Sequence, residues 1–229
     1  MNFLLIPGFM TDERLWKDII EDLSSLGDVF HGRMSNNTAL KKLALDIIEN
    51  APSRFTLIGF SLGGYVARWI ASLVPDRVEA MILIATSNLP DATTQLQQKQ
   101  TNAKMAGMNT YGGLSTAAIR SSLHQSNKKN NELIEVIRSM SISLGTETFI
   151  QQSQIERNNP TLFTNKFPVL VIASACDELR TVAESEALIS DYLNSELCII
   201  EQAGHMIPLE NSKELMLSIR KWLEKSSLL

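Results

Sequence analysis

Short apolar runs alternate along the chain with longer segments in which apolar residues recur every three or four positions. A short apolar run bounded by turn residues predicts a strand buried on both faces, and the longer period predicts an amphipathic helix. Strands and helices that alternate in this way are typical of a parallel sheet covered by helices on both faces. The predicted strands are, in chain order, residues 3–6, a weaker one at 29–34, 55–58, 80–85, 168–173 and 197–200.

Helical stripes are predicted between these strands. The stripe Leu40, Leu43, Ala44, Ile47, Ile48 has the spacing of one buried helix face. A capping box at Thr181 and Glu184 predicts the start of a helix, and Asn211 is a candidate cap for the closing helix. Further stripes predict helices over 16–23, 66–74, 133–140 and 215–223.

The regular pattern breaks down between residues 88 and 165, a segment rich in Gln, Asn, Ser and Thr that contains no convincing strand. The pattern resumes after it. We therefore expect an α/β fold with a mostly parallel sheet of about six strands. Residues 1–87 and 166–229 are the expected core, and 88–165 a helical insertion.

Composition limits the classes of function. The 229 residues are 44% hydrophobic and 20% charged, with a formal net charge of -4. No basic surface is expected for nucleic acid or an acidic membrane, and no apolar run approaches the roughly 18 residues of a membrane span. The first residues lack the pattern of a signal peptide. Cys176 and Cys198 lie in apolar runs, which favours core residues over a disulfide and predicts a cytoplasmic protein.

The segment Gly59-Phe60-Ser61-Leu62-Gly63 has the pattern G-x-S-x-G between a predicted strand and a predicted helix. A sharp turn at such a junction lifts the serine above the sheet edge, and glycines allow the close backbone approach that the turn requires. The alternative is a glycine-rich turn with a purely structural role. We predict Ser61 as a nucleophile.

A serine hydroxyl needs a base to accept its proton. Of the three histidines, His31 and His124 lie in weakly patterned segments, whereas His205 directly follows the last predicted strand. The carboxyl ends of parallel strands share one edge of the sheet, so His205 is expected beside Ser61.

The base in turn needs a carboxylate that orients it. Asp177 follows the penultimate predicted strand, with Glu178 as its competitor. Asp177 is preferred because it lies nearer the strand end, and the order serine, acid, histidine is that of the α/β hydrolases.

With these residues in place, the chain resembles the α/β-hydrolase superfamily over nearly its whole length. The resemblance is carried by Gly-Phe-Ser-Leu-Gly-Gly from residue 59, Ala-Cys-Asp-Glu-Leu from 175 and Ala-Gly-His-Met-Ile-Pro-Leu-Glu from 203. The segment Leu-Leu-Ile-Pro-Gly-Phe from residue 4 is similar to the family's first-strand segment, with Pro7 in place of a histidine. The family's glycine two residues before the acid is Ser174 or Ala175 here.

The resemblance implies further features. Phe9 and Leu62 would supply the backbone N–H groups of an oxyanion hole. The usual first hairpin is missing, so the sheet should be trimmed to about six strands. The insertion falls where relatives carry a helical cap. Apolar residues could line an acyl pocket beneath it, although for each of them a purely packing role is the alternative: Phe9, Met10, Phe60, Met105, Met108, Tyr111, Phe149 and Met206.

The expected function is a carboxylic ester hydrolase for an ester, thioester or lactone with a small, mostly apolar acyl group. The alternatives are a carbon–carbon or eliminating lyase with the same triad, and a small-molecule receptor with negligible turnover. No metal-ligand spacing, phosphate loop or dinucleotide fingerprint implies a cofactor. The expected partner is a small-molecule substrate, without nucleic acid or membrane, and the chain is expected to be a monomer or homodimer.

Overall fold

A computed structural model describes residues 1–34, 37–108, 110–160 and 166–229. Its sheet has six strands in the order β2-β1-β3-β4-β5-β6, and every neighbouring pair is parallel. Each strand predicted from the sequence is present, and most of the predicted strand ends lie within about two residues of the observed ones. The strands are β1 Asn2–Ile6, β2 Asp28–His31, β3 Phe55–Phe60, β4 Val78–Ile84, β5 Val169–Ser174 and β6 Ser195–Ile200.

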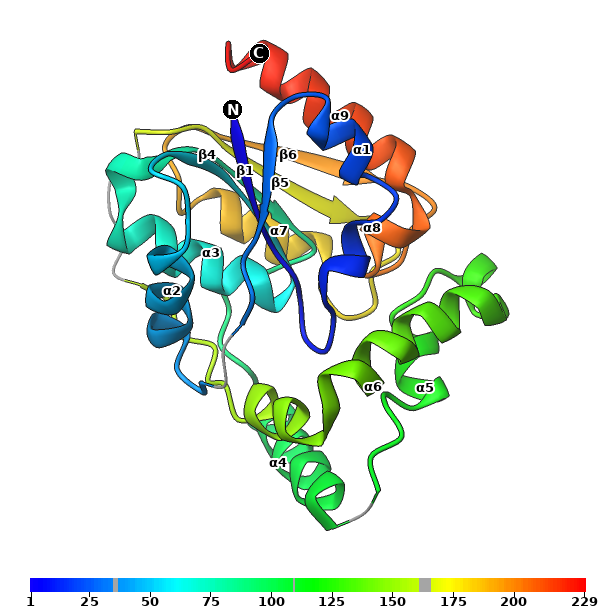
Figure 1. Cartoon of the computed structure of the whole chain (residues 1–229). Helices are drawn as coiled ribbons and strands as arrows, with labels where there is room; N and C mark the ends of the chain where they lie inside the picture. Colours follow the sequence, from blue (N-terminus) through cyan, green and yellow to red (C-terminus); the bar gives the residue numbers. More distant parts are fainter. Residues whose placement is uncertain (35–36, 109, 161–165) are drawn as a thin grey trace.

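Helices connect these strands and cover the sheet (Figure 1). The α-helices are α1 Ile20–Ser24, α2 Leu40–Glu49, α3 Leu62–Leu73, α4 Thr93–Met108, α5 Thr116–Ser121, α6 Asn131–Ser153, α7 Val182–Ile189, α8 Ile207–Glu210 and α9 Ser212–Lys225. The described residues also form the short 3₁₀ helices η1 Glu13–Trp16, η2 Pro75–Arg77 and η3 Gln125–Asn127.

The two faces of the sheet carry separate cores, because successive side chains of a strand point to opposite faces. On one face, Leu57 of β3 and Met81 of β4 pack with residues of α2, α3 and α7. On the other face, Ile58 and Ile82 pack with residues of η1, α1 and α9. The predicted doubly covered sheet is therefore confirmed.

Some local predictions differ from the structure. The single helix expected over 16–23 is divided into η1 and α1. Asn211 precedes α9 but makes no side-chain cap; its amide instead donates to the carbonyl of Glu201 at 3.0 Å. Cys176 is exposed rather than buried, because it lies in the loop beyond the end of β5.

Between β4 and β5 the chain forms α4, α5, η3 and α6, called here the inserted helices. They lie together at one side of the molecule, beyond one end of the sheet (Figure 1). Buried side chains of α5 and α6, among them Ile119, Ile137 and Met140, join the core on the α9 face of the sheet. Helices α5 and α6 therefore continue this core.

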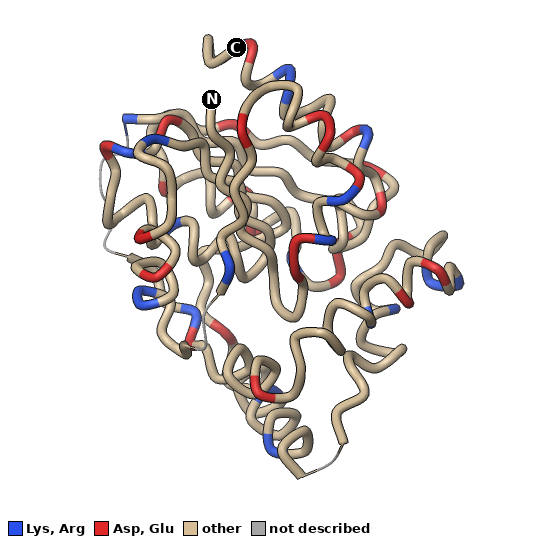
Figure 2. Tube along the Cα trace, in the orientation of Figure 1, with Lys and Arg blue, Asp and Glu red and all other residues tan. Residues whose placement is uncertain are grey.

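Acidic and basic residues are interspersed along the trace in this view (Figure 2). No helix of the described residues is long and apolar enough to cross a membrane.

Candidate active site

The sharp turn between β3 and α3 places Ser61 at the carboxyl end of the sheet. Its backbone has φ 50° and ψ -113°, a conformation that a non-glycine residue adopts only when its surroundings impose it. The Ser61 N–H donates to the Ile84 carbonyl at 2.9 Å, and the Ser61 carbonyl accepts from Thr86 Oγ1 at 2.7 Å. The neighbouring strand β4 and Thr86, two residues beyond its end, thus hold the turn in place.

The two glycines of the G-x-S-x-G motif are sterically required. A Cβ on Gly59 would lie 2.6 Å from the Gly63 carbonyl oxygen, and one on Gly63 would lie 2.2 Å from the Ile6 carbonyl oxygen. Both neighbours are backbone atoms, so neither position has room for a side chain.

Ser61, His205 and Asp177 form one hydrogen-bonded row. The Ser61 Oγ lies 2.9 Å from His205 Nε2, and His205 Nδ1 lies 2.7 Å from Asp177 Oδ2. All three residues are buried, with exposed fractions of 8%, 6% and 8% for Ser61, His205 and Asp177. The structure therefore brings together the three residues that the sequence singled out.

Asp177 is fixed on its far side as well. Its Oδ1 accepts hydrogen bonds from the backbone N–H groups of Leu179 at 2.7 Å and Arg180 at 2.9 Å. The competing carboxylate, Glu178, points elsewhere: its side chain is 61% exposed and pairs with Lys128 at 2.9 Å. His205 therefore contacts Asp177 and not Glu178.

Two backbone N–H groups near the serine turn, those of Phe9 and Leu62, make no hydrogen bond to another of the described residues. Leu62 is the first residue of α3, where N–H groups have no acceptor within the helix. The Phe9 N–H lies in the loop after β1, and Gly8 of this loop packs against Phe60. These are the two donors that the sequence analysis assigned to an oxyanion hole.

One aromatic side chain packs against this row, and three others form a cluster with the Phe9 loop. The Phe60 ring lies 5.1 Å from the His205 ring, and Phe149 lies 5.6 Å from Phe9 and 5.0 Å from Tyr111, measured between ring centroids. Burial raises the pKa of the Tyr111 phenol. The aromatic residues named from the sequence are thus brought together near the Phe9 loop.

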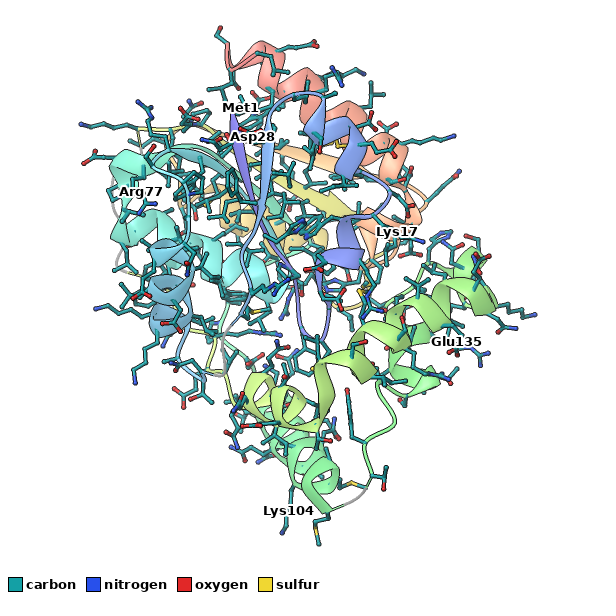
Figure 3. The ribbon with its side chains drawn as sticks, viewed as in Figure 1. Met1, Lys17, Asp28, Arg77, Lys104 and Glu135 are labelled. Atoms are coloured by element: carbon teal, nitrogen blue, oxygen red, sulfur yellow. The ribbon has the colours of Figure 1, made fainter. Side chains whose placement is uncertain are left out.

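The methionines named with them divide into two groups. Met10 and Met206 are 0% and 4% exposed. Met105 and Met108 are 58% and 76% exposed, at the end of α4. Lys104, just before them, points outward at the tip farthest from the sheet (Figure 3). Both side chains are therefore exposed rather than buried with the other apolar residues, and their place in an acyl pocket stays a prediction.

A carboxylate that the sequence pattern did not reveal anchors the histidine loop. Glu210 Oε1 accepts from the Gly204 N–H at 2.8 Å, and its Oε2 accepts from the His124 N–H at 2.7 Å and the Asn127 amide at 3.0 Å. The His205 N–H also donates to the Ser122 carbonyl at 2.8 Å. Glu210 ends the quoted motif, but its partners near residue 124 could not be read from spacing.

The comparisons with known proteins agree with this geometry. A family model described as the alpha/beta hydrolase fold matches residues 50–212. The chain belongs to the α/β-hydrolase fold family.

Among individual proteins, a solved thermophilic esterase from Thermogutta terrifontis is 26% identical, with a TM-score of 0.84, over 99% of this chain and 90% of that chain. An enol-lactonase from Burkholderia xenovorans shares the fold, with a TM-score of 0.84 at 17% identity over 97% of this chain and 91% of that chain. A pimeloyl-[acyl-carrier protein] methyl ester esterase from Pseudoalteromonas atlantica is 35% identical over 96 residues, which are 38% of this chain and 37% of that relative. The chain thus matches little more than a third of that curated relative's length. Together these similarities show the α/β-hydrolase fold over nearly the whole chain.

Proposed function

We propose that this protein is a serine hydrolase that cleaves a carboxylic ester, thioester or lactone through an acyl-enzyme on Ser61. The observation that carries the proposal is the row Ser61–His205–Asp177, with contacts of 2.9 and 2.7 Å at a strained strand-to-helix turn. A base within hydrogen-bond reach of a hydroxyl, itself oriented by a carboxylate, is the arrangement that activates a serine nucleophile.

In the proposed mechanism each group has its own role. Ser61 Oγ attacks the carbonyl carbon while His205 Nε2 takes its proton, and Asp177 stabilises the resulting imidazolium. The electron pair of the C=O bond moves to its oxygen, where the N–H groups of Phe9 and Leu62 stabilise the negative charge. The C=O bond re-forms, the C–O or C–S bond to the leaving group breaks, and His205 gives its proton to that group. Water, activated by the same base, then releases the acid and restores Ser61.

A small, mostly apolar acyl group fits the surroundings of the row. Phe9, Phe60, Tyr111 and Phe149 are uncharged, and Met206 is buried beside His205. The names of the similar esterases and of the lactonase support esters and lactones as the substrate class. We also propose that residues 88–165 act as the cap over this site, since the chain of α6 reaches the Phe9 loop.

A panel of p-nitrophenyl esters and acyl thioesters of increasing acyl length, run with the wild type and Ser61→Ala, tests the proposal. We expect cleavage of short chains by the wild type and a loss of at least ~10³-fold in Ser61→Ala. Mass spectrometry should detect an acyl group on Ser61 early in the reaction. Substrate turnover without such an adduct would indicate the lyase alternative, and equal rates for the two proteins would refute the mechanism.

A further inference from the structure

The loop that carries the Phe9 N–H is held from outside by a side chain of the inserted helices. The Met10 N–H, one residue beyond Phe9, donates to Gln152 Oε1 at 2.8 Å. Both residues are buried, with exposed fractions of 0% for Met10 and 6% for Gln152. The two are 142 positions apart in the sequence, so this bond joins the first loop of the core to the end of α6.

The loop contains a strained backbone position that this hydrogen bond stabilises. Met10 has φ 51°, a left-handed conformation that a non-glycine side chain disfavours. Within the loop, the Gly8 N–H donates to Thr11 Oγ1 at 2.8 Å, and the Thr11 N–H donates to the Gly8 carbonyl at a longer 3.4 Å. These bonds close the ends of the turn, but neither involves Met10 at its centre. Gln152 therefore supplies the bond at the strained position.

The orientation of the Gln152 amide follows from chemistry. A backbone N–H is only a donor, so the oxygen of the amide must face Met10. One helical turn earlier, Phe149 packs on Phe9 with ring centroids 5.6 Å apart. Positions three apart share a helix face, so the last turn of α6 contacts two successive loop residues.

A kink in α6 sets the direction of this last turn. Gly145 has φ 79° and ψ 176°, which is not helical, so the two halves of α6 run in different directions. A Cβ on Gly145 would meet no atom within 4 Å, so the glycine serves the backbone conformation rather than close packing. The second half of α6 thereby presents Phe149 and Gln152 to the loop.

We infer that Gln152 is a positioning residue for the oxyanion hole: by accepting from the Met10 N–H, it fixes the Phe9–Met10 peptide and so restrains Phe9, whose own N–H lies in the adjoining Gly8–Phe9 peptide. The inference rests on the proposed function. Gln152 touches no reacting atom. It stabilises the loop geometry in which an N–H donor meets the oxyanion, and a displacement of about 1 Å at such a donor costs on the order of 100-fold in rate.

Gln152→Met tests this, because methionine keeps the length and volume of the side chain but removes the acceptor. Gln151→Met is the matched control on the same helix, since Gln151 is half-buried and its amide NH₂ donates to Glu147 rather than to the Phe9 loop. For Gln152→Met we expect kcat to fall about 10- to 100-fold with KM within about twofold of the wild type. Gln151→Met should match the wild type in both constants.

A second readout separates positioning from general destabilisation. A trifluoromethyl ketone carrying the preferred acyl chain adds to Ser61 and forms an oxyanion in the hole. Its inhibition constant should rise in Gln152→Met by the factor by which kcat falls, because both report the same donor. An unchanged inhibition constant beside a lower kcat would overturn the inference. So would a higher KM at unchanged kcat, which would make Gln152 a substrate contact.

Amide hydrogen exchange over residues 7–11 provides a measurement that does not depend on turnover. Exchange should accelerate in Gln152→Met and stay at the wild-type rate in Gln151→Met; equal rates would overturn the inference. Gln152→Asn, whose amide is too short to reach Met10, should behave like Gln152→Met and replaces it if that variant does not fold. Activity kept by Ser61→Ala would refute the proposed function, whereas activity kept by Gln152→Met would refute only the role of Gln152.

Discussion

Asp177→Asn changes one atom of the row and leaves its shape intact. In the wild type, Oδ1 of Asp177 accepts two backbone N–H bonds, at 2.7 and 2.9 Å. The asparagine oxygen must take this place, because an NH₂ group there would leave two buried donors unpaired at about 1–3 kcal/mol each. The asparagine NH₂ then faces His205 Nδ1, where Oδ2 stood at 2.7 Å.

This reversal determines the tautomer of His205. Nδ1 has to accept from the amide, so the proton moves to Nε2, the atom that lies 2.9 Å from Ser61 Oγ in the wild type. A protonated Nε2 is unable to take the serine proton. The loss expected for this defect is about 10⁴-fold in kcat, which corresponds to about 5 kcal/mol of barrier.

The assay is steady-state hydrolysis of the best ester of the panel by Asp177→Asn, with Glu178→Gln as the control. Glu178 is 61% exposed and contacts Lys128, so the control should keep wild-type kcat. Thermal unfolding should show that both variants are folded. A kcat for Asp177→Asn above about a hundredth of the wild-type value would refute the assigned tautomer and with it the role of Asp177.

Three further predictions concern stability. Gly63→Ala places a Cβ 2.2 Å from a backbone carbonyl oxygen, so urea titrations should show a free energy of unfolding lower by about 1–3 kcal/mol or more. The control is Gly107→Ala, whose Cβ would make only an ordinary contact at 3.6 Å and should not lower the free energy of unfolding. In Glu210→Gln, the new NH₂ group faces at least one of the three N–H donors that the carboxylate binds, so that donor loses its acceptor. The free energy of unfolding should therefore fall by about 2 kcal/mol, and kcat should fall with it. The exposed Glu224→Gln is its control, and equal stabilities would contradict the anchoring role. Burial raises the pKa of Tyr192 above 10.0, so above about pH 10 the folded state binds more protons than the unfolded state and stability falls as pH rises; Tyr192→Phe should flatten this fall, and an unchanged slope would refute it.

Much of the fold could be predicted from the sequence because it depends on local periodicity. Short apolar runs specified the strands, and stripes such as that of α2 specified the amphipathic helices. The triad followed from a topological rule: strands that run parallel bring their carboxyl ends to one edge. Ser61, Asp177 and His205 each follow such an end, so their meeting needed no knowledge of side-chain packing.

What only the tertiary structure decided are the contacts between segments far apart in the chain. Gln152 and Glu210 look like ordinary polar helix residues in the sequence, yet one binds the Met10 N–H and the other joins the histidine loop to residues 124 and 127. Met105 and Met108 show the reverse case, since apolar character predicted a pocket and packing left them exposed. Periodicity records which face of an element is buried. It does not record which partner covers that face, because that choice depends on how the inserted helices pack on the core.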